Sequence, residues 1–225
     1  MTSSLQTHFT VSPGTKIHVY MPWADVHCAI GHLVRLISDF YKKNDFRIED
    51  LPYLITIARG GMVPSYLLSS RIGIKNIRVL DSIHFSPCGG NAICLGNPTM
   101  TSWPNGNLPK NGIIPVLDDI IDTGKMFFRI KQVMSKNALF LFLIARSAWL
   151  PYAQDENNNI YVGTWIPEEL ANTYIIFPWE VYDFCGASKN PTLETLYTQD
   201  LLMFGFKGSK IIPDELKSLN FFLSK

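Results

Sequence analysis

The sequence has few cysteines, almost no net charge and no long hydrophobic run. None of its four cysteines stands in a C-x-x-C pair, which excludes a disulfide-rich secreted scaffold. A net charge of +1 gives no electrostatic basis for binding nucleic acid or an anionic membrane surface. The most apolar run, residues 138–145, is far too short to cross a membrane, and residues 1–16 lack a signal-peptide core. We therefore expect a cytoplasmic protein.

The 225 residues are 47% hydrophobic and 17% charged, which is typical of a globular chain with one main domain. Strand patterns alternate with helix patterns. This order predicts a mainly parallel α/β sheet, because parallel strands need crossover connections. The strands are expected at 16–20, 54–58, 77–83, 112–117, 138–145 and 160–166, and the helices at 25–41, 64–73 and 125–135.

The most informative stretch runs from Val116 to Lys125. An apolar segment leads into Asp118 and Asp119, and Asp122 and a Thr-Gly turn follow before an amphipathic segment. The pattern predicts a strand, an acidic loop, a turn and a helix. Ligands of open α/β sheets bind at such strand ends, and a helix start offers free N–H groups to an anion. Carboxylates beside an anion site indicate a metal-bridged phosphate ester, although adjacent aspartates are also common as a solvated helix cap.

Three segments together resemble one family. The run Asp118-Asp119-x-x-Asp122-Thr123-Gly124 resembles the phosphoribosyl pyrophosphate signature of type I phosphoribosyltransferases. Residues 58–64, Ala-Arg-Gly-Gly-Met-Val-Pro, resemble the pyrophosphate loop of that family. Residues 164–166 and 178–180 resemble the base-binding hood of the bacterial xanthine–guanine phosphoribosyltransferases. The segments occur in the family's order over residues 16–184, and this order makes the resemblance specific.

The resemblance implies a type I phosphoribosyltransferase fold, with a parallel sheet flanked by helices, a small hood and a C-terminal helical extension. The implied domain covers residues 16–185, between an N-terminal tail at 1–15 and the extension at 186–225. Within it, residues 84–112 stand where the family has a flexible catalytic loop, and residues 160–184 contain the hood. Family members commonly form homodimers or homotetramers, so an oligomer is expected.

The implied activity is Mg²⁺-dependent purine salvage. A 6-oxopurine (xanthine, guanine or hypoxanthine) and phosphoribosyl pyrophosphate would become a nucleoside monophosphate and pyrophosphate. Asp118 and Asp119 would hold the ribose and the metal, and Asp122 would be the general base. Phosphoribosyl pyrophosphate would be bound by Arg59, Gly60, Gly61, Asp118, Asp119, Asp122, Thr123, Gly124, Lys125 and Met126, and the base by Arg146, Trp165, Ile166 and Glu180. Two alternatives stay open: a non-catalytic nucleotide sensor on the same fold, and transfer to a different nucleobase.

Four residues depart from the family pattern. Met126 stands where a threonine usually contacts the 5′-phosphate, which predicts weaker binding of phosphoribosyl pyrophosphate. Arg146 replaces a lysine directed at the purine 6-oxo group, and Glu180 replaces an aspartate of the hood. Pro115 interrupts the strand before the acidic pair, which indicates a bulge or a neighbouring position without an acceptor.

Overall fold

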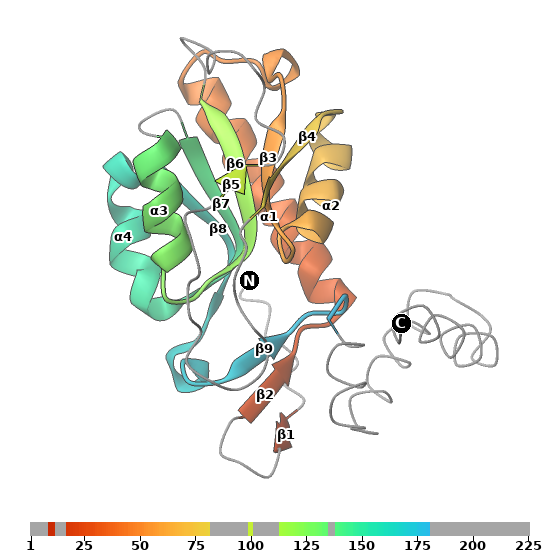
Figure 1. Ribbon diagram of the computed structural model, residues 1–225, viewed down its shortest axis with the longest axis vertical. Helices are drawn as coiled ribbons and strands as arrows, with labels where there is room; N and C mark the ends of the chain where they lie inside the picture. Colours follow the sequence, from red (N-terminus) through yellow and green to blue (C-terminus); the bar gives the residue numbers. More distant parts are fainter. Residues whose placement is uncertain (1–8, 12–16, 82–98, 101–112, 135–137, 181–225) are drawn as a thin grey trace, which may run out of the picture. The chain divides into compact units, whose positions relative to one another are not determined.

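The computed structural model describes residues 9–11, 17–81, 99–100, 113–134 and 138–180 (Figure 1). The chain divides into two compact units: Met1–Asp25 with Asn172–Lys225, and Val26–Ala171. The expected N-terminal tail, the C-terminal extension and both expected domain boundaries lie almost entirely outside the described residues. So does the expected catalytic loop, apart from Thr99 and Met100.

The larger unit is built on a six-stranded sheet in the order β5-β4-β3-β6-β7-β8. Five neighbouring strands run parallel, and only β5 is antiparallel to its neighbour β4. This arrangement confirms the predicted α/β fold class. The strands are β3 (Leu54–Ala58), β4 (Ile77–Asp81), β5 (Thr99–Met100), β6 (Ile114–Ile121), β7 (Ala138–Arg146) and β8 (Ile160–Ile166).

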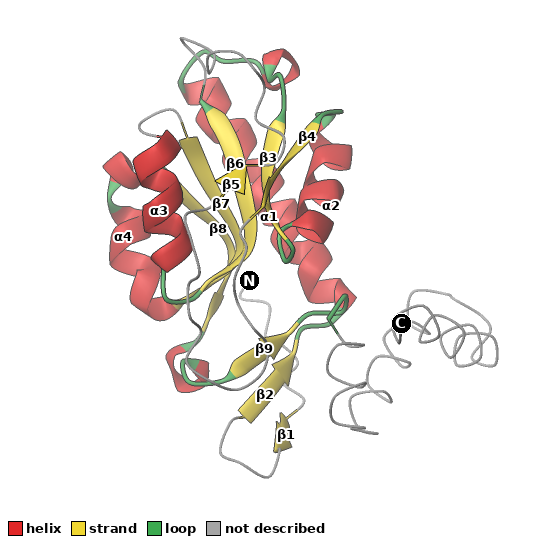
Figure 2. Ribbon diagram, in the orientation of Figure 1, coloured by secondary structure: helices red, strands yellow, loops and turns green. Residues whose placement is uncertain are grey.

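Four α-helices flank this sheet, with α1 and α2 on one face and α3 and α4 on the other (Figures 1 and 2). Helix α1 begins at Trp23, two residues before its predicted start, so Asp25 lies in the first turn instead of capping it. None of the helices in the described ranges combines the length and the apolarity that crossing a bilayer requires. The α-helices are α1 (Trp23–Lys43), α2 (Met62–Ile72), α3 (Lys125–Met134) and α4 (Leu150–Gln154), and the short 3-10 helices are η1 (Ile48–Asp50), η3 (Ser147–Trp149), η4 (Glu156–Asn158) and η5 (Glu168–Leu170).

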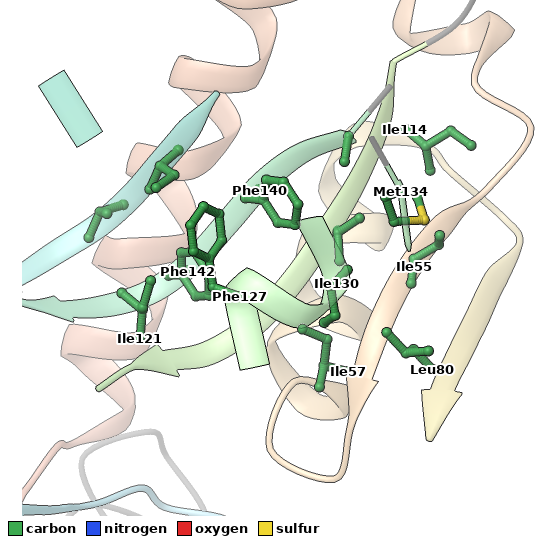
Figure 3. Close-up of a cluster of buried hydrophobic side chains, with 14 of the residues drawn as sticks. Ile55, Ile57, Leu80, Ile114, Ile121, Phe127, Ile130, Met134, Phe140 and Phe142 are labelled. Atoms are coloured by element: carbon green, nitrogen blue, oxygen red, sulfur yellow. The ribbon is translucent and has the colours of Figure 1, made fainter. Parts of the chain in front are cut away.

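The core between the sheet and α3 is a continuous hydrophobic cluster (Figure 3). Phe127 and Ile130 of α3 pack onto side chains from β3, β6, β7 and β8, and the Phe127 ring lies edge-on to Phe140 at 4.9 Å. Strand β7 is buried from Ala138 to Ala145, because helices cover both faces of the sheet. Burial on both faces explains why this segment reads as an unbroken apolar run.

Strand β6 differs from its prediction in two ways. It continues through Asp118 and Asp119 to Ile121, so the acidic pair belongs to the strand and no acidic loop follows it. Pro115 causes no bulge, since the register with β7 is unbroken from Ile114 to Ile121. On the other side, β6 pairs with β3 only from Val116 onward, so the proline precedes that ladder.

The smaller unit contains a three-stranded sheet in the order β1-β2-β9, formed by β1 (Phe9–Val11), β2 (Ile17–Tyr20) and β9 (Tyr174–Ile176). Beyond β9, the Trp179 ring stacks on Phe177 with centroids 4.7 Å apart and packs against Trp23 at 5.9 Å. Glu180 accepts a hydrogen bond from the Phe177 amide at 3.2 Å. Glu180 therefore fixes a local turn within this unit.

Candidate functional site

The acidic pair lies near the carboxyl end of β6. Asp119 is 8% exposed, and Asp118 is partly buried. The Asp118 carboxylate accepts the Asp119 amide at 2.9 Å, and the Asp119 carboxylate accepts the Ile120 amide at 2.7 Å. Burial raises the pKa of Asp118 to about 7. Burial, and then the Asp118 charge, raise the pKa of Asp119 well above its ordinary value.

The predicted pyrophosphate loop meets this pair. The loop follows β3, which neighbours β6, and leads directly into α2. Its Ala58–Arg59 peptide bond is cis, and the Arg59 side chain is exposed. A Cβ placed on Gly60 would overlap the Asp119 carboxylate, so only glycine fits there without a shift. Residues about sixty positions apart are thus brought into contact at one sheet edge.

The predicted 5′-phosphate turn, Asp122 to Gly124, connects β6 with α3. Gly124 has φ +72°, a left-handed conformation that favours glycine, and its carbonyl accepts the Phe128 amide at 3.0 Å. Asp122, Thr123 and Lys125 are exposed, so a ligand can reach them. Met126 is partly buried and packs against the hydrophobic cluster of the core.

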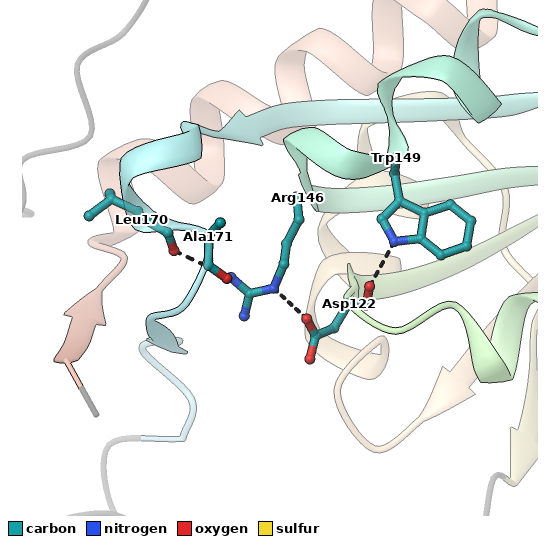
Figure 4. A network of polar contacts seen from close by, with 5 residues as sticks. All are labelled: Asp122, Arg146, Trp149, Leu170 and Ala171. Atoms are coloured by element: carbon teal, nitrogen blue, oxygen red, sulfur yellow. Dashed lines mark hydrogen bonds and ion pairs between the residues drawn. The ribbon is translucent and has the colours of Figure 1, made fainter. Parts of the chain in front are cut away.

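Asp122 is held by Arg146, the last residue of β7, and by Trp149 of η3 (Figure 4). The Arg146 Nε donates to the Asp122 carboxylate, and another guanidinium nitrogen of Arg146 donates to the Ala171 and Leu170 carbonyls at 2.6 and 3.4 Å. The Trp149 indole N–H donates to the Asp122 carbonyl at 2.7 Å. Sequence reasoning assigned no role to Trp149, and no motif marks it. The Asp122 side chain is still 53% exposed, which leaves it open to a ligand.

The remaining predicted base-binding residues lie in two places. Trp165 and Ile166 end β8, where Ile166 is opposite Arg146 in the ladder. Trp165 is partly buried and packs against the hydrophobic cluster, and Ile166 is buried. Glu180 belongs to the smaller compact unit. The larger unit therefore gathers every predicted site residue except Glu180.

The acidic pair has the chemistry of a magnesium site that is completed by a substrate. Within the described residues, no group of three or more His, Cys, Asp or Glu side chains could hold a metal, and no ion pair involves Asp118 or Asp119. Magnesium is commonly bound through one or two carboxylates together with substrate phosphates and water. One buried and one partly buried carboxylate, both with raised pKa values and without an ion pair within the described residues, fit this kind of site.

Comparisons with known proteins find distant relatives and structures of similar fold. No protein-family model matches the chain. Over 129 residues, 57% of the chain and 68% of the relative, it is 24% identical to a xanthine-guanine phosphoribosyltransferase of Roseobacter denitrificans. A purine phosphoribosyltransferase structure from Pyrococcus horikoshii is 23% identical, with TM-score 0.49 over 72% of this chain and 93% of that one. A Neisseria gonorrhoeae protein with bound ppGpp is 18% identical, with TM-score 0.50 over 72% and 89%.

Proposed function

We propose that this chain, which belongs to the type I phosphoribosyltransferase family as a distant homologue of its xanthine–guanine members, is a purine phosphoribosyltransferase. The reaction would join a 6-oxopurine to the ribose of phosphoribosyl pyrophosphate and release pyrophosphate. The observation that carries the proposal is the contact between Gly60 and the Asp119 carboxylate. It brings a loop suited to the leaving group next to carboxylates suited to the ribose and its metal.

Each part of the site has a task in this reaction. Asp118 and Asp119 would hold the ribose hydroxyls and a Mg²⁺ ion, which supplies positive charge to the pyrophosphate when it is bound. Backbone N–H groups at Gly60 and Gly61 would approach the leaving group, with Arg59 adding charge. The turn from Asp122 through Thr123 and Gly124, with the helix start at Lys125 and Met126, would bind the 5′-phosphate.

We propose that Asp122 accepts the proton released by the bond changes. A ring nitrogen of the purine bonds to C1 of the ribose, the bond from C1 to the pyrophosphate oxygen breaks, and pyrophosphate leaves with the electron pair. The ring nitrogen loses its proton, and the Asp122 carboxylate would accept it. The ion pair with Arg146 supports this role because it fixes the direction of the carboxylate.

Recognition of the base would come from Arg146, Trp165 and Ile166. The Arg146 guanidinium carries several donors in one plane, which suits recognition of a 6-oxo group. A homodimer or homotetramer is the assembly we propose, following the family.

The decisive experiment incubates the protein with Mg²⁺, phosphoribosyl pyrophosphate and a panel of nucleobases, and follows pyrophosphate release. We expect release with xanthine, guanine or hypoxanthine, and at least a hundredfold lower kcat for Asp122→Ala, because general-base catalysis typically contributes ~10²–10⁴-fold. Asp155→Ala, at an exposed carboxylate outside the site, is the matched control. Release from the Asp122→Ala variant at the full rate would reject Asp122 as the proton acceptor.

A nucleotide sensor on the same fold is the second candidate. It is favoured by Met126, which offers no hydroxyl to a phosphate, and by the ppGpp bound to the N. gonorrhoeae protein of similar fold. Saturable binding of ppGpp, combined with no pyrophosphate release for any base in the panel, would select the sensor. Release that requires a purine would select the transferase.

A further inference from the structure

Trp149 lies directly behind the predicted 5′-phosphate turn. Its indole N–H donates to the Asp122 carbonyl, and its ring occupies the space that a side chain on Gly124 would need. A Cβ placed on Gly124 would overlap two carbons of the six-membered ring. One side chain therefore holds both ends of the turn, by a hydrogen bond at Asp122 and by direct contact at Gly124.

The indole is itself fixed by aromatic neighbours. Its centroid lies 5.0 Å from that of Tyr152 and 5.8 Å from those of Phe127 and Phe128. Trp149 is 7% exposed and belongs to the hydrophobic cluster of the larger unit. Because the ring packs against side chains of both α3 and α4, it cannot move away from the turn without disrupting the core.

The turn needs this support because it has little support of its own. Asp122 and Thr123 are exposed, and the Met126 side chain packs into the core instead of offering a hydroxyl. A phosphate bound there would depend on backbone N–H groups, whose directions depend on the conformation of the turn. The Asp122 carboxylate is fixed separately, by Arg146.

We propose that Trp149 is a positioning residue that holds the Asp122–Gly124 turn in the conformation that binds the 5′-phosphate. This role rests on the proposed function only in its assignment of the phosphate to the turn. Since the 5′-phosphate is bound equally before and during the reaction, loss of Trp149 should raise KM and leave kcat nearly unchanged. A merely structural residue would lower the apparent kcat, because fewer molecules are folded, and would leave KM unchanged.

The test compares Trp149→Phe, which keeps an aromatic ring and removes the N–H donor, with Tyr152→Phe, which changes a neighbouring ring that does not bond the turn. For Trp149→Phe we expect the KM for phosphoribosyl pyrophosphate and the Kd for ribose 5-phosphate to rise about tenfold, with kcat within about twofold. The Kd for pyrophosphate with Mg²⁺ should stay within about twofold, and Tyr152→Phe should change none of these values by more than that.

Several outcomes decide the proposal. Unchanged affinity for ribose 5-phosphate in a folded Trp149→Phe protein would overturn it, and so would equal weakening of both ligands. If the wild-type protein releases no pyrophosphate but binds ribose 5-phosphate in a Trp149-dependent way, the enzyme proposal fails and the positioning role stands. A wild-type protein that binds no ribose 5-phosphate would overturn the positioning role, while pyrophosphate release would still decide the enzyme proposal.

If Trp149→Phe does not fold, nuclear magnetic resonance on the wild-type protein gives the answer. The Trp149 indole N–H signal, assigned by elimination with the other tryptophans replaced singly, should shift when ribose 5-phosphate is added. It should respond far less to Mg²⁺ with pyrophosphate. An indole signal that does not move at saturating ribose 5-phosphate would overturn the proposal.

Discussion

The acidic pair, Asp118 and Asp119, and the predicted 5′-phosphate turn, Asp122 to Gly124, lie at the end of one strand, yet the protein supports them differently. In β6, Asp119 is buried and Asp118 is partly buried, their pKa values are raised, and no ion pair to them exists within the described residues. Asp122 is exposed, and the protein supplies both a guanidinium for its carboxylate and an indole N–H for its carbonyl.

This difference indicates where each part obtains its stabilisation. At the acidic pair, compensation of the negative charge is left to the ligand, as expected for a metal that arrives with a substrate. At the turn, the protein itself fixes the conformation before any ligand binds, which lowers the entropic cost of binding. Pyrophosphate with Mg²⁺ and ribose 5-phosphate are therefore separate probes of the two parts.

Gly60→Ala should produce the largest difference between the two parts in the loss of ligand affinity. The new methyl group would collide with the Asp119 carboxylate, which is itself held by the Ile120 amide. Overpacking of about 2 kcal/mol predicts roughly 30-fold weaker binding of pyrophosphate with Mg²⁺, measured by calorimetric titration. Ribose 5-phosphate affinity should stay within about twofold, since the turn is not touched.

Gly31→Ala is the matched control for that variant. A Cβ at Gly31 would meet an Arg71 guanidinium nitrogen at 3.5 Å, an ordinary contact, and alanine suits the interior of α1. Equal losses of both ligands in Gly60→Ala would contradict the separation of the two parts.

A second effect should appear in the pH dependence of stability. Because the folded-state pKa values of Asp118 and Asp119 lie above the usual unfolded value near 4, folding favours the protonated carboxyls. The stabilising contribution of Asp118 is complete below about pH 4 and is lost as the pH rises through about 7, and that of Asp119 is also lost as the pH rises. Relative to Asp118→Asn, the wild-type protein without ligand should lose roughly 5 °C in Tm between pH 5 and pH 8.

Thermal scans at several pH values test this expectation, with and without Mg²⁺ and pyrophosphate. The ligands should restore the wild-type Tm at pH 8 and do much less for Asp118→Asn. Parallel pH profiles for the two proteins would show that the carboxylates are already compensated, and the contrast with Asp122 would disappear.

The smallest effect is expected from Met126→Thr. The new hydroxyl could bond the 5′-phosphate and lower the KM for phosphoribosyl pyrophosphate about threefold, while lost packing against the core would reduce stability by about 1 kcal/mol. Met126→Leu keeps the apolar contact and adds no hydroxyl, so its KM should match that of the wild type. An unchanged or raised KM in Met126→Thr would reject the idea that the missing hydroxyl weakens the binding of phosphoribosyl pyrophosphate.

The fold and the position of the predicted pyrophosphate loop could be inferred from local sequence patterns. Apolar runs bounded by turn residues predicted the observed bounds of β3 and β8. Gly73 follows the last residue of α2 in a left-handed conformation, which is typical of a residue that ends a helix. The contact between Gly60 and Asp119 required only the rule that adjacent parallel strands end at one edge.

The supporting contacts of the turn could not be predicted in this way. Trp149 does not belong to any recognisable sequence motif. Its position behind Gly124 depends on the path of η3 after β7 and on packing with aromatic rings from two helices. Arg146 was predicted to face the base, and its bond to Asp122 follows from the distance between the ends of β6 and β7, which periodicity does not encode. The end of β6 was misjudged because carboxylates usually terminate strands.

Because β6 extends through its acidic residues, the two parts of the site should also differ in how readily their backbone opens. Asp118 is paired with Phe142 in a ladder between two central strands, so its backbone opens only when the sheet itself unfolds. Thr123 lies beyond the last ladder pair, at Ile121, and its amide can exchange with solvent through local opening. The acidic half of the site would then persist as long as the domain does, whereas the turn depends on its contacts with Trp149 and Arg146 and is where ligand-dependent protection would first appear.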